Sequence, residues 1–178
     1  IPDFIGIQNY TREVVQHSWW TPYIRAGIIP AQKRKVPVTL LNWEIFPEGI
    51  RHLLHKFNNY PEVKSIIVTE NGAAFNDEII HGTVSDIQRT HYLRKYISEV
   101  MTAAKEGVKV DGYFAWSLTD NFEWAEGYYP RFGLIHVDYA TQKRTIKASG
   151  QFYSELIRLQ QSQQKTSEPS FTSMRVNS

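Results

Sequence analysis

Short apolar runs alternate with longer amphipathic segments along the first 160 residues of the chain. Runs rich in β-branched and aromatic residues, too short for helices, predict strands at 3–8, 63–69 and 110–118, with a further short strand at 132–137. Apolar positions at helical spacing predict helices that follow Pro47, that run from about 85 to 107, and that cover about 149–159. The repeated order of strand, loop and helix is typical of an α/β fold with a parallel sheet.

The apolar stripes identify the side chains expected in the core. The strand at 63–69 contains Ile66-Ile67-Val68 and is expected to be buried on both faces. The first helix is expected to bury Ile50, Leu53, Leu54 and Phe57. The second has capping-box spacing at 85–88 and is expected to bury Ile87, Tyr92, Tyr96, Ile97, Val100 and Ala104.

Two segments lack a sustained period. Residues 11–41 form a long loop, and loops of this length inside a compact domain are usually functional. Its basic run Lys33-Arg34-Lys35 is expected to be solvated. After Gln160 the composition becomes polar, so the sequence predicts one folded region at 1–160 and a disordered tail at 161–178.

Composition removes several classes of function. The 178 residues are 42% hydrophobic and carry a net charge of +2 with both signs interspersed, so neither nucleic acid nor a membrane surface is expected as a partner. There is no Cys, which excludes disulfides and thiolate metal sites. Aromatic residues make up 13%, including five Trp and ten Tyr, and several lie beside carboxylates and amides, as suits a sugar site. For any single ring, a place in the core is the simpler interpretation.

The residues with candidate chemistry each lie at or just after the carboxyl end of a predicted strand. They are Tyr10, Glu70, Trp116 and Glu123. The carboxyl ends of parallel strands meet at one edge, where barrels build their active sites. Taken singly, each residue has a plainer role: Glu70 capping a turn or pairing with a base, Glu123 pairing with Arg131, and Tyr10 packing in the core.

Metal and cofactor sites find little support. His52 and His55 lie three residues apart on a predicted helix, but no carboxylate at suitable spacing joins them, so an exposed helical face is expected. There is no glycine-rich phosphate loop, because Gly127 and Gly133 are isolated. We therefore predict neither a metal nor a cofactor.

An ordered set of motifs favours the chemical roles of these residues over the plainer ones. They are Asp3-Phe4-Ile5-Gly6-Ile7 with Tyr10, Trp43 to Gly49, Thr69-Glu70-Asn71-Gly72, Trp116 to Trp124, Gly127 to Leu134, Val137-Asp138-Tyr139 and Thr145 to Ser149. Together they resemble family 1 of the glycoside hydrolases, the β-glucosidase family, over about residues 3–157. The resemblance implies a (β/α)8 TIM barrel, of which this chain supplies the sixth, seventh and eighth βα units.

The resemblance also implies roles for individual residues. Glu70 aligns with the catalytic nucleophile, and Tyr10 with the tyrosine that hydrogen-bonds it. The sugar-binding positions are Trp116 under the ring, Glu123 and Trp124 at the 4- and 6-hydroxyls, Trp43 on the aglycone side and Phe132 near the 6-position. One departure from the family pattern is Gln8, which stands where an Asn near the nucleophile is usual.

The implied activity is retaining hydrolysis of terminal β-D-glucosyl or related residues by double displacement, on a small β-glycoside or an oligosaccharide. The family's acid/base Glu lies in a Thr-x-Asn-Glu-Pro motif that this sequence lacks, so it is expected outside the chain, in a missing N-terminal part of the barrel. The isolated chain is then expected to be inactive. The alternative is a glycosidase-like pseudoenzyme or sugar-binding module without turnover.

Overall fold

A computed structural model describes the backbone of residues 2–167 and the side chains through residue 163. Its centre is a three-stranded parallel sheet in the order β1-β4-β7, formed by β1 (Ile5–Gln8), β4 (Ile66–Asn71) and β7 (Val110–Ala115). The three strands lie within the predicted ranges or end within two residues of them. The expectation of a parallel α/β arrangement is confirmed.

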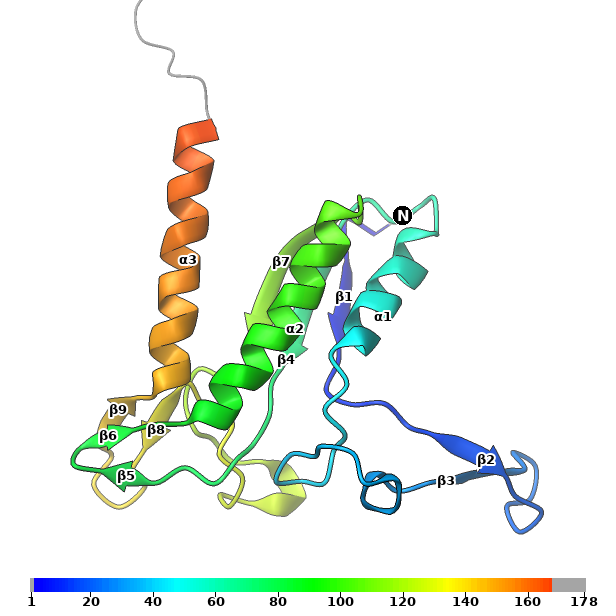
Figure 1. The fold of residues 1–178 in the computed structure, drawn as a ribbon, viewed down its shortest axis with the longest axis horizontal. Helices are drawn as coiled ribbons and strands as arrows, with labels where there is room; N and C mark the ends of the chain where they lie inside the picture. Colours follow the sequence, from blue (N-terminus) through cyan, green and yellow to red (C-terminus); the bar gives the residue numbers. More distant parts are fainter. Residues whose placement is uncertain (1, 168–178) are drawn as a thin grey trace, which may run out of the picture.

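Helices cover one face of this sheet. They are α1 (Glu48–Asn58), α2 (Ile87–Lys105) and α3 (Ala148–Ser167), with α1 and α2 packed side by side (Figure 1). Ile66 and Val68 of β4 are fully buried against this layer, together with Ile50 and Leu54 of α1. The predicted stripe of α1 is confirmed, because Leu53 and Phe57 also pack against the core.

Small elements gather at the carboxyl ends of the central strands, at the bottom of Figure 1. They are the antiparallel pairs β2 (Val15–His17) with β3 (Ala26–Ile28), β5 (Ile79–Ile80) with β6 (Thr83–Val84), and β8 (Ile135–Val137) with β9 (Arg144–Ile146), and the 3-10 helices at Ala31–Arg34 and Trp124–Glu126. The predicted loop at 11–41 thus contains a hairpin and a 3-10 turn. The predicted strand at 132–137 begins only at Ile135.

The prediction that the central strand is buried on both faces is wrong for this structure. Ile66 and Val68 are fully buried, but Ile67 and Thr69 on the opposite face are only half-buried. Phe114 of β7 lies on that second face, near Gly112 and Ile67, and is 60% exposed. The reason is that the described helices cover only one side of the sheet.

Two details of α2 also differ from the prediction. Ile87 is 60% exposed and Ala104 is exposed, whereas Ala103 is fully buried, so the buried stripe is shifted at both ends. No side-chain capping bond is present at the start of α2. The carboxylate of Asp86 is instead hydrogen-bonded to Arg89 and Ser149.

The last helix continues past its predicted end. Helix α3 runs to Ser167, so the prediction of a disordered tail is wrong for 161–167. The polar residues there include Gln and Lys, which have good helix propensity, and polarity alone does not end a helix. The remainder of the predicted tail, 168–178, lies outside the described residues.

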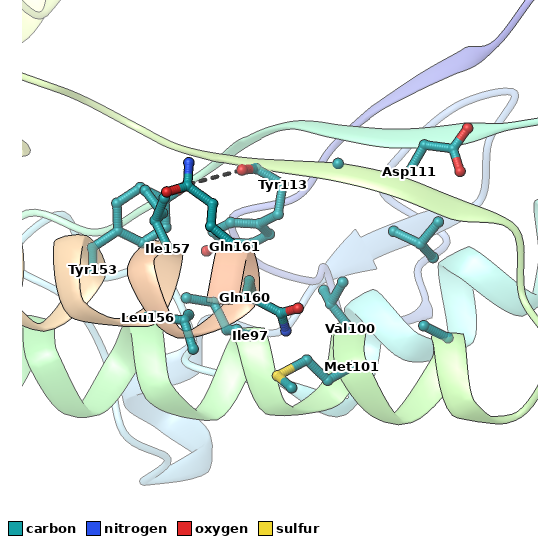
Figure 2. A pocket seen from close by; sticks show the side chains of 13 residues that line it. Ile97, Val100, Met101, Asp111, Tyr113, Tyr153, Leu156, Ile157, Gln160 and Gln161 are labelled. Atoms are coloured by element: carbon teal, nitrogen blue, oxygen red, sulfur yellow. Dashed lines mark hydrogen bonds between the residues drawn. The ribbon is translucent and has the colours of Figure 1, made fainter. Parts of the chain in front are cut away.

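An apolar groove lies between α2, α3 and the outer side of β7. Its volume is about 410 Å³, and Figure 2 shows Ile97, Val100, Leu156 and Ile157 among its lining side chains. At one end the hydroxyl of Tyr153 donates to the backbone oxygen of Tyr113 at 2.8 Å. The groove contains none of the predicted site residues.

Among the described residues, no helix combines the length and the apolar character needed to cross a bilayer.

Candidate active site

The carboxylate of Glu70 lies at the carboxyl end of β4, beside the end of β1. The parallel register pairs Gln8 with Glu70, which brings their side chains together. The amide Nε2 of Gln8 donates to Oε1 of Glu70 at 2.9 Å, and the hydroxyl of Tyr10 donates to Oε2 at 2.7 Å. Both oxygens are thus held by neutral donors, and within the described part of the chain no Lys, Arg or His forms an ion pair with Glu70.

Tyr10 is the centre of a small aromatic group. Its ring meets Trp43 edge-on at a centroid distance of 5.5 Å and Phe132 at 6.4 Å, and those two rings lie 6.0 Å apart. Phe132 is 1% exposed and is therefore a fully buried member of this group. Burial and the neighbouring Glu70 carboxylate raise the pKa of Tyr10 far above its usual value. The phenol therefore stays protonated and acts as a donor.

A second group of predicted residues follows β7. The indole Nε1 of Trp116 donates to Oε1 of Glu123 at 3.2 Å, and Nδ2 of Asn121 donates to the same oxygen at 2.7 Å. Arg131 is not the partner of Glu123, because it pairs with Asp120 at 3.0 Å. The second oxygen of Glu123, Oε2, has no donor among the described side chains.

The two groups meet through the backbone. The amide of Trp116 donates to the carbonyl of Asn71 at 2.9 Å, directly after Glu70. A Cβ atom at Gly72 would lie 1.9 Å from the carbonyl oxygen of Trp116, so only glycine permits this approach. The Thr-Glu-Asn-Gly sequence thus places the nucleophile candidate and the tryptophan platform candidate next to each other.

Asn71 is a functional position that the sequence interpretation missed. Its side chain is fully buried and donates to the carbonyl of Asn9 at 2.6 Å and to the hydroxyl of Tyr92 at 3.0 Å, while Oδ1 accepts from Tyr113 at 2.6 Å. These bonds tie the ends of β1, β4 and β7 to α2. The sequence signal for it is its place in the motif Thr69-Glu70-Asn71-Gly72, directly after the nucleophile candidate.

Trp124 is the predicted site residue that stands apart from the others. It begins the 3-10 helix after Glu123, with φ at 48°, and its side chain is 84% exposed. The structure therefore brings together Tyr10, Glu70, Trp43 and Phe132 in one group and Trp116 with Glu123 in another.

Glu44, the residue after Trp43, holds the segment on either side of the β2–β3 hairpin in place through two ion pairs. It is 3% exposed and binds Arg12 at 2.9 Å and Arg34 at 2.6 Å, one arginine from each side of the β2–β3 hairpin. Hydrogen bonds from Arg12 and Arg34 lower the pKa of Glu44 to about 2. The expectation that Arg34 is solvated is therefore wrong.

A cluster of charged side chains, which we call the buried ion cluster, joins the segments that follow β4 and β7 to the starts of α2 and α3. Its members are Asp77, Asp86, Arg89, Asp120, Arg131 and Lys147. Burial disfavours the charge of Asp120, but Lys147 and Arg131 outweigh that effect and hold the pKa of this carboxyl below its usual range. Single-residue patterns in the sequence give no sign of the cluster, because its members are up to 70 positions apart.

The described side chains offer no clear metal site. No three His, Cys, Asp or Glu residues within that set gather in a metal-binding arrangement. Nε2 of His55 lies 2.6 Å from Glu106, so this histidine has a partner of its own.

Comparison with known proteins places this geometry in a family. The family model "Glycosyl hydrolase family 1" matches residues 1–162. The chain is 45% identical over 157 residues to a 1,4-beta-D-glucan glucohydrolase of Thermotoga neapolitana, covering 88% of this chain and 34% of that protein. It thus spans about a third of the length of this relative.

Solved structures agree with the sequence match. The family 1 b-glucosidase from Thermotoga maritima matches with a TM-score of 0.83 and 43% identity, over 88% of this chain and 34% of that one. The Thermotoga maritima beta-glucosidase in complex with glucoimidazole matches with a TM-score of 0.81, 43% identity and the same shares of the two chains. These neighbours are TIM barrels. The chain described here belongs to glycosyl hydrolase family 1.

Proposed function

We propose that this chain is part of a retaining β-glycosidase that hydrolyses terminal β-D-glucosyl or related residues, with Glu70 as the nucleophile. The observation that carries the proposal is the environment of Glu70: both carboxylate oxygens accept hydrogen bonds from neutral donors, and no described Lys, Arg or His side chain forms an ion pair with it. A carboxylate held in this way is oriented and remains nucleophilic. The family and its β-glucosidase relatives supply the reaction class.

Tyr10 and Gln8 orient the nucleophile for attack. In a retaining glycosidase one carboxylate attacks the anomeric carbon, the glycosyl–oxygen bond breaks, and a second carboxyl group protonates the leaving oxygen. The two carboxyl groups lie about 5–5.5 Å apart. Water then hydrolyses the glycosyl–enzyme ester. The two donors hold the carboxylate in one orientation, and Gln8, which stands where an Asn is usual in the family, makes its contact with Glu70 at 2.9 Å.

Glu123 and Trp116 form the sugar-binding part of the proposed site. Trp116 and Asn121 hold Oε1 of Glu123, which leaves Oε2 to accept a sugar hydroxyl. The half-buried indole of Trp116 offers a flat apolar face for the C–H side of the ring, with Trp43 beyond Tyr10 on the aglycone side. The charge of Glu123 disfavours a sugar phosphorylated at the 6-position, because two negative charges would repel each other there.

The chain supplies, in this proposal, the last three βα units of a (β/α)8 barrel. Two features support it: β1 and β7 each have an unpaired edge in the sheet of the described residues, and the relatives are about three times as long as the match. The remaining barrel would pair with both edges, cover the second face around Phe114, and contribute the acid/base carboxyl. The substrate partner is then a small β-glycoside or an oligosaccharide.

A completed barrel tests this proposal. We define it as the Thermotoga maritima beta-glucosidase in which the 157 matched residues are replaced by those of this chain. Incubation with a 2-deoxy-2-fluoro-β-glucoside that carries a good leaving group is expected to trap the glycosyl–enzyme ester, and peptide mass spectrometry is expected to find the adduct on Glu70.

The matched control is Glu62→Gln, an exposed carboxylate in the turn that precedes the same strand, which should label normally. An adduct on another residue of an active enzyme would refute Glu70 as the nucleophile. Sugar binding without any turnover in the completed barrel would favour the pseudoenzyme alternative.

A further inference from the structure

The buried ion cluster joins loops that follow different strands. Asp77 lies in the segment after β4, Asp120 in the segment after β7, and Lys147 directly before α3. The side chains of all three are fully buried. The cluster holds three carboxylates and three cations, so its charges balance; five of the six side chains are fully buried, and Arg131 is partly exposed.

Lys147 bridges the two loops directly. Its ammonium Nζ lies 2.5 Å from Oδ2 of Asp77 and 2.7 Å from Oδ1 of Asp120. The ladder between β4 and β7 ends at the pair Asn71 and Ala115. Past that point the contact of Trp116 with Asn71 and this shared ammonium join the two loops. Arg89 of α2 adds a third link, because it donates to Asp77 in one loop and to the backbone oxygen of Arg131 in the other.

Asp120 connects Lys147 to the proposed sugar-binding residues Glu123 and Trp116. Its carboxylate also accepts hydrogen bonds from the backbone amides of Gly133 at 2.9 Å and Val137 at 3.2 Å, which joins the start and the end of the segment 120–137. The next residue, Asn121, donates directly to Glu123 at 2.7 Å. One chain of contacts therefore leads from Lys147 through Asp120 and Asn121 to Glu123.

We propose that Lys147 is a positioning residue for the glycosidase reaction: by holding Asp77 and Asp120 together, its ammonium sets the place of Glu123 relative to Glu70. The inference rests on the proposed function, because it assigns Glu123 to the sugar and Glu70 to the anomeric carbon. A displacement of about 1 Å at such a group can lower the rate by about a hundredfold. Removal of the ammonium is therefore expected to weaken the contact between Glu123 and the sugar hydroxyl that it binds.

The test compares two substrates in the completed barrel. An aryl β-glucoside and its 4-deoxy analogue differ only at a hydroxyl assigned to Glu123, so their ratio of kcat/KM measures that contact. In Lys147→Met we expect this ratio to fall about tenfold, toward the ratio of Glu123→Gln. A purely structural role would lower kcat/KM for both substrates by the same factor, and that result would overturn the proposal.

Two further variants keep the test decisive. Lys147→Met combined with Asp77→Asn removes one charge of each sign, so it keeps the cluster balanced if Lys147→Met alone fails to fold; the same fall in the ratio is expected. Lys143→Met, an exposed lysine four residues earlier, is the control and should leave the ratio unchanged. Failure of the proposed function is distinguished because it would appear in the unsubstituted completed barrel, as absence of turnover or of the Glu70 adduct.

Discussion

Glu70 and Asp120 are carboxylates near the carboxyl ends of neighbouring strands of one parallel sheet, yet their surroundings are opposite. Glu70 is half-buried and meets two neutral donors, Tyr10 and Gln8. Asp120 is fully buried and meets two cations, Lys147 and Arg131, as well as two backbone amides. A compensated charge holds a structure together, whereas a charge that is oriented but not compensated can react.

The sharpest way to break this comparison is to remove the charge of Glu70. In the completed barrel, Glu70→Gln is expected to lower kcat by roughly 10⁵-fold, as for other covalent nucleophiles, while stability stays within about 0.5 kcal/mol. Steady-state hydrolysis of an aryl β-glucoside and urea unfolding measure the two effects. Glu62→Gln should change neither, and an active Glu70→Gln enzyme would contradict the assignment.

At Asp120 a substitution is expected to lower stability rather than to act on the chemical step. Asp120→Asn leaves Lys147 and Arg131 with one carboxylate fewer in the interior, so the free energy of unfolding should fall by about 3 kcal/mol. Urea denaturation followed by circular dichroism checks this value. A loss smaller than that caused by Glu44→Gln would mean that the buried ion cluster does not carry the stability inferred for it.

The donors to Glu70 can be separated from each other. Tyr10→Phe keeps the ring between Trp43 and Phe132 but removes the hydroxyl, and kcat is expected to fall by about a hundredfold. Gln8→Ala removes the other donor, which lies in an exposed position, and a fall of about tenfold is expected. Equal effects would show that the aromatic enclosure of Tyr10 adds nothing to its hydrogen bond.

The smallest expected effect concerns pH. The folded-state pKa of Glu44 is lowered to about 2 from an ordinary value of 4.5. Its contribution is therefore fully present above about pH 4.5 and is lost as the pH falls toward 2. Glu44→Gln is expected to cost about 2 kcal/mol at pH 7 and to flatten the dependence of stability on pH in that window, as urea unfolding at several pH values would show.

The sequence predicted the elements better than their surroundings. Apolar periodicity located β4 and the stripe of α1, because burial on one side of a helix or strand leaves a local pattern. It failed for the faces of β4, since a strand's sequence alone does not tell which side is covered. The prediction from polar composition is also wrong at the end of α3, because residues 161–167 are helical.

The candidate site divides in the same way. Tyr10 and Glu70 were paired by the resemblance, and the 2.7 Å hydrogen bond is present. No local periodicity pairs Arg34 with Glu44 across an irregular loop, or Lys147 with Asp77 across 70 positions. A basic run and an isolated lysine look alike in a sequence whether they are solvated or fully buried.

The close approach at Gly72 has a consequence for engineering. Any directed-evolution library that varies the residues around Glu70 must leave this position as glycine, because even the smallest side chain would collide with the carbonyl of Trp116. Position 133 carries the same restriction, since a Cβ there would lie 2.2 Å from the amide nitrogen of Asp120. Substrate range in this scaffold is therefore better altered at exposed rings such as Trp124, where side chains can change without moving the backbone.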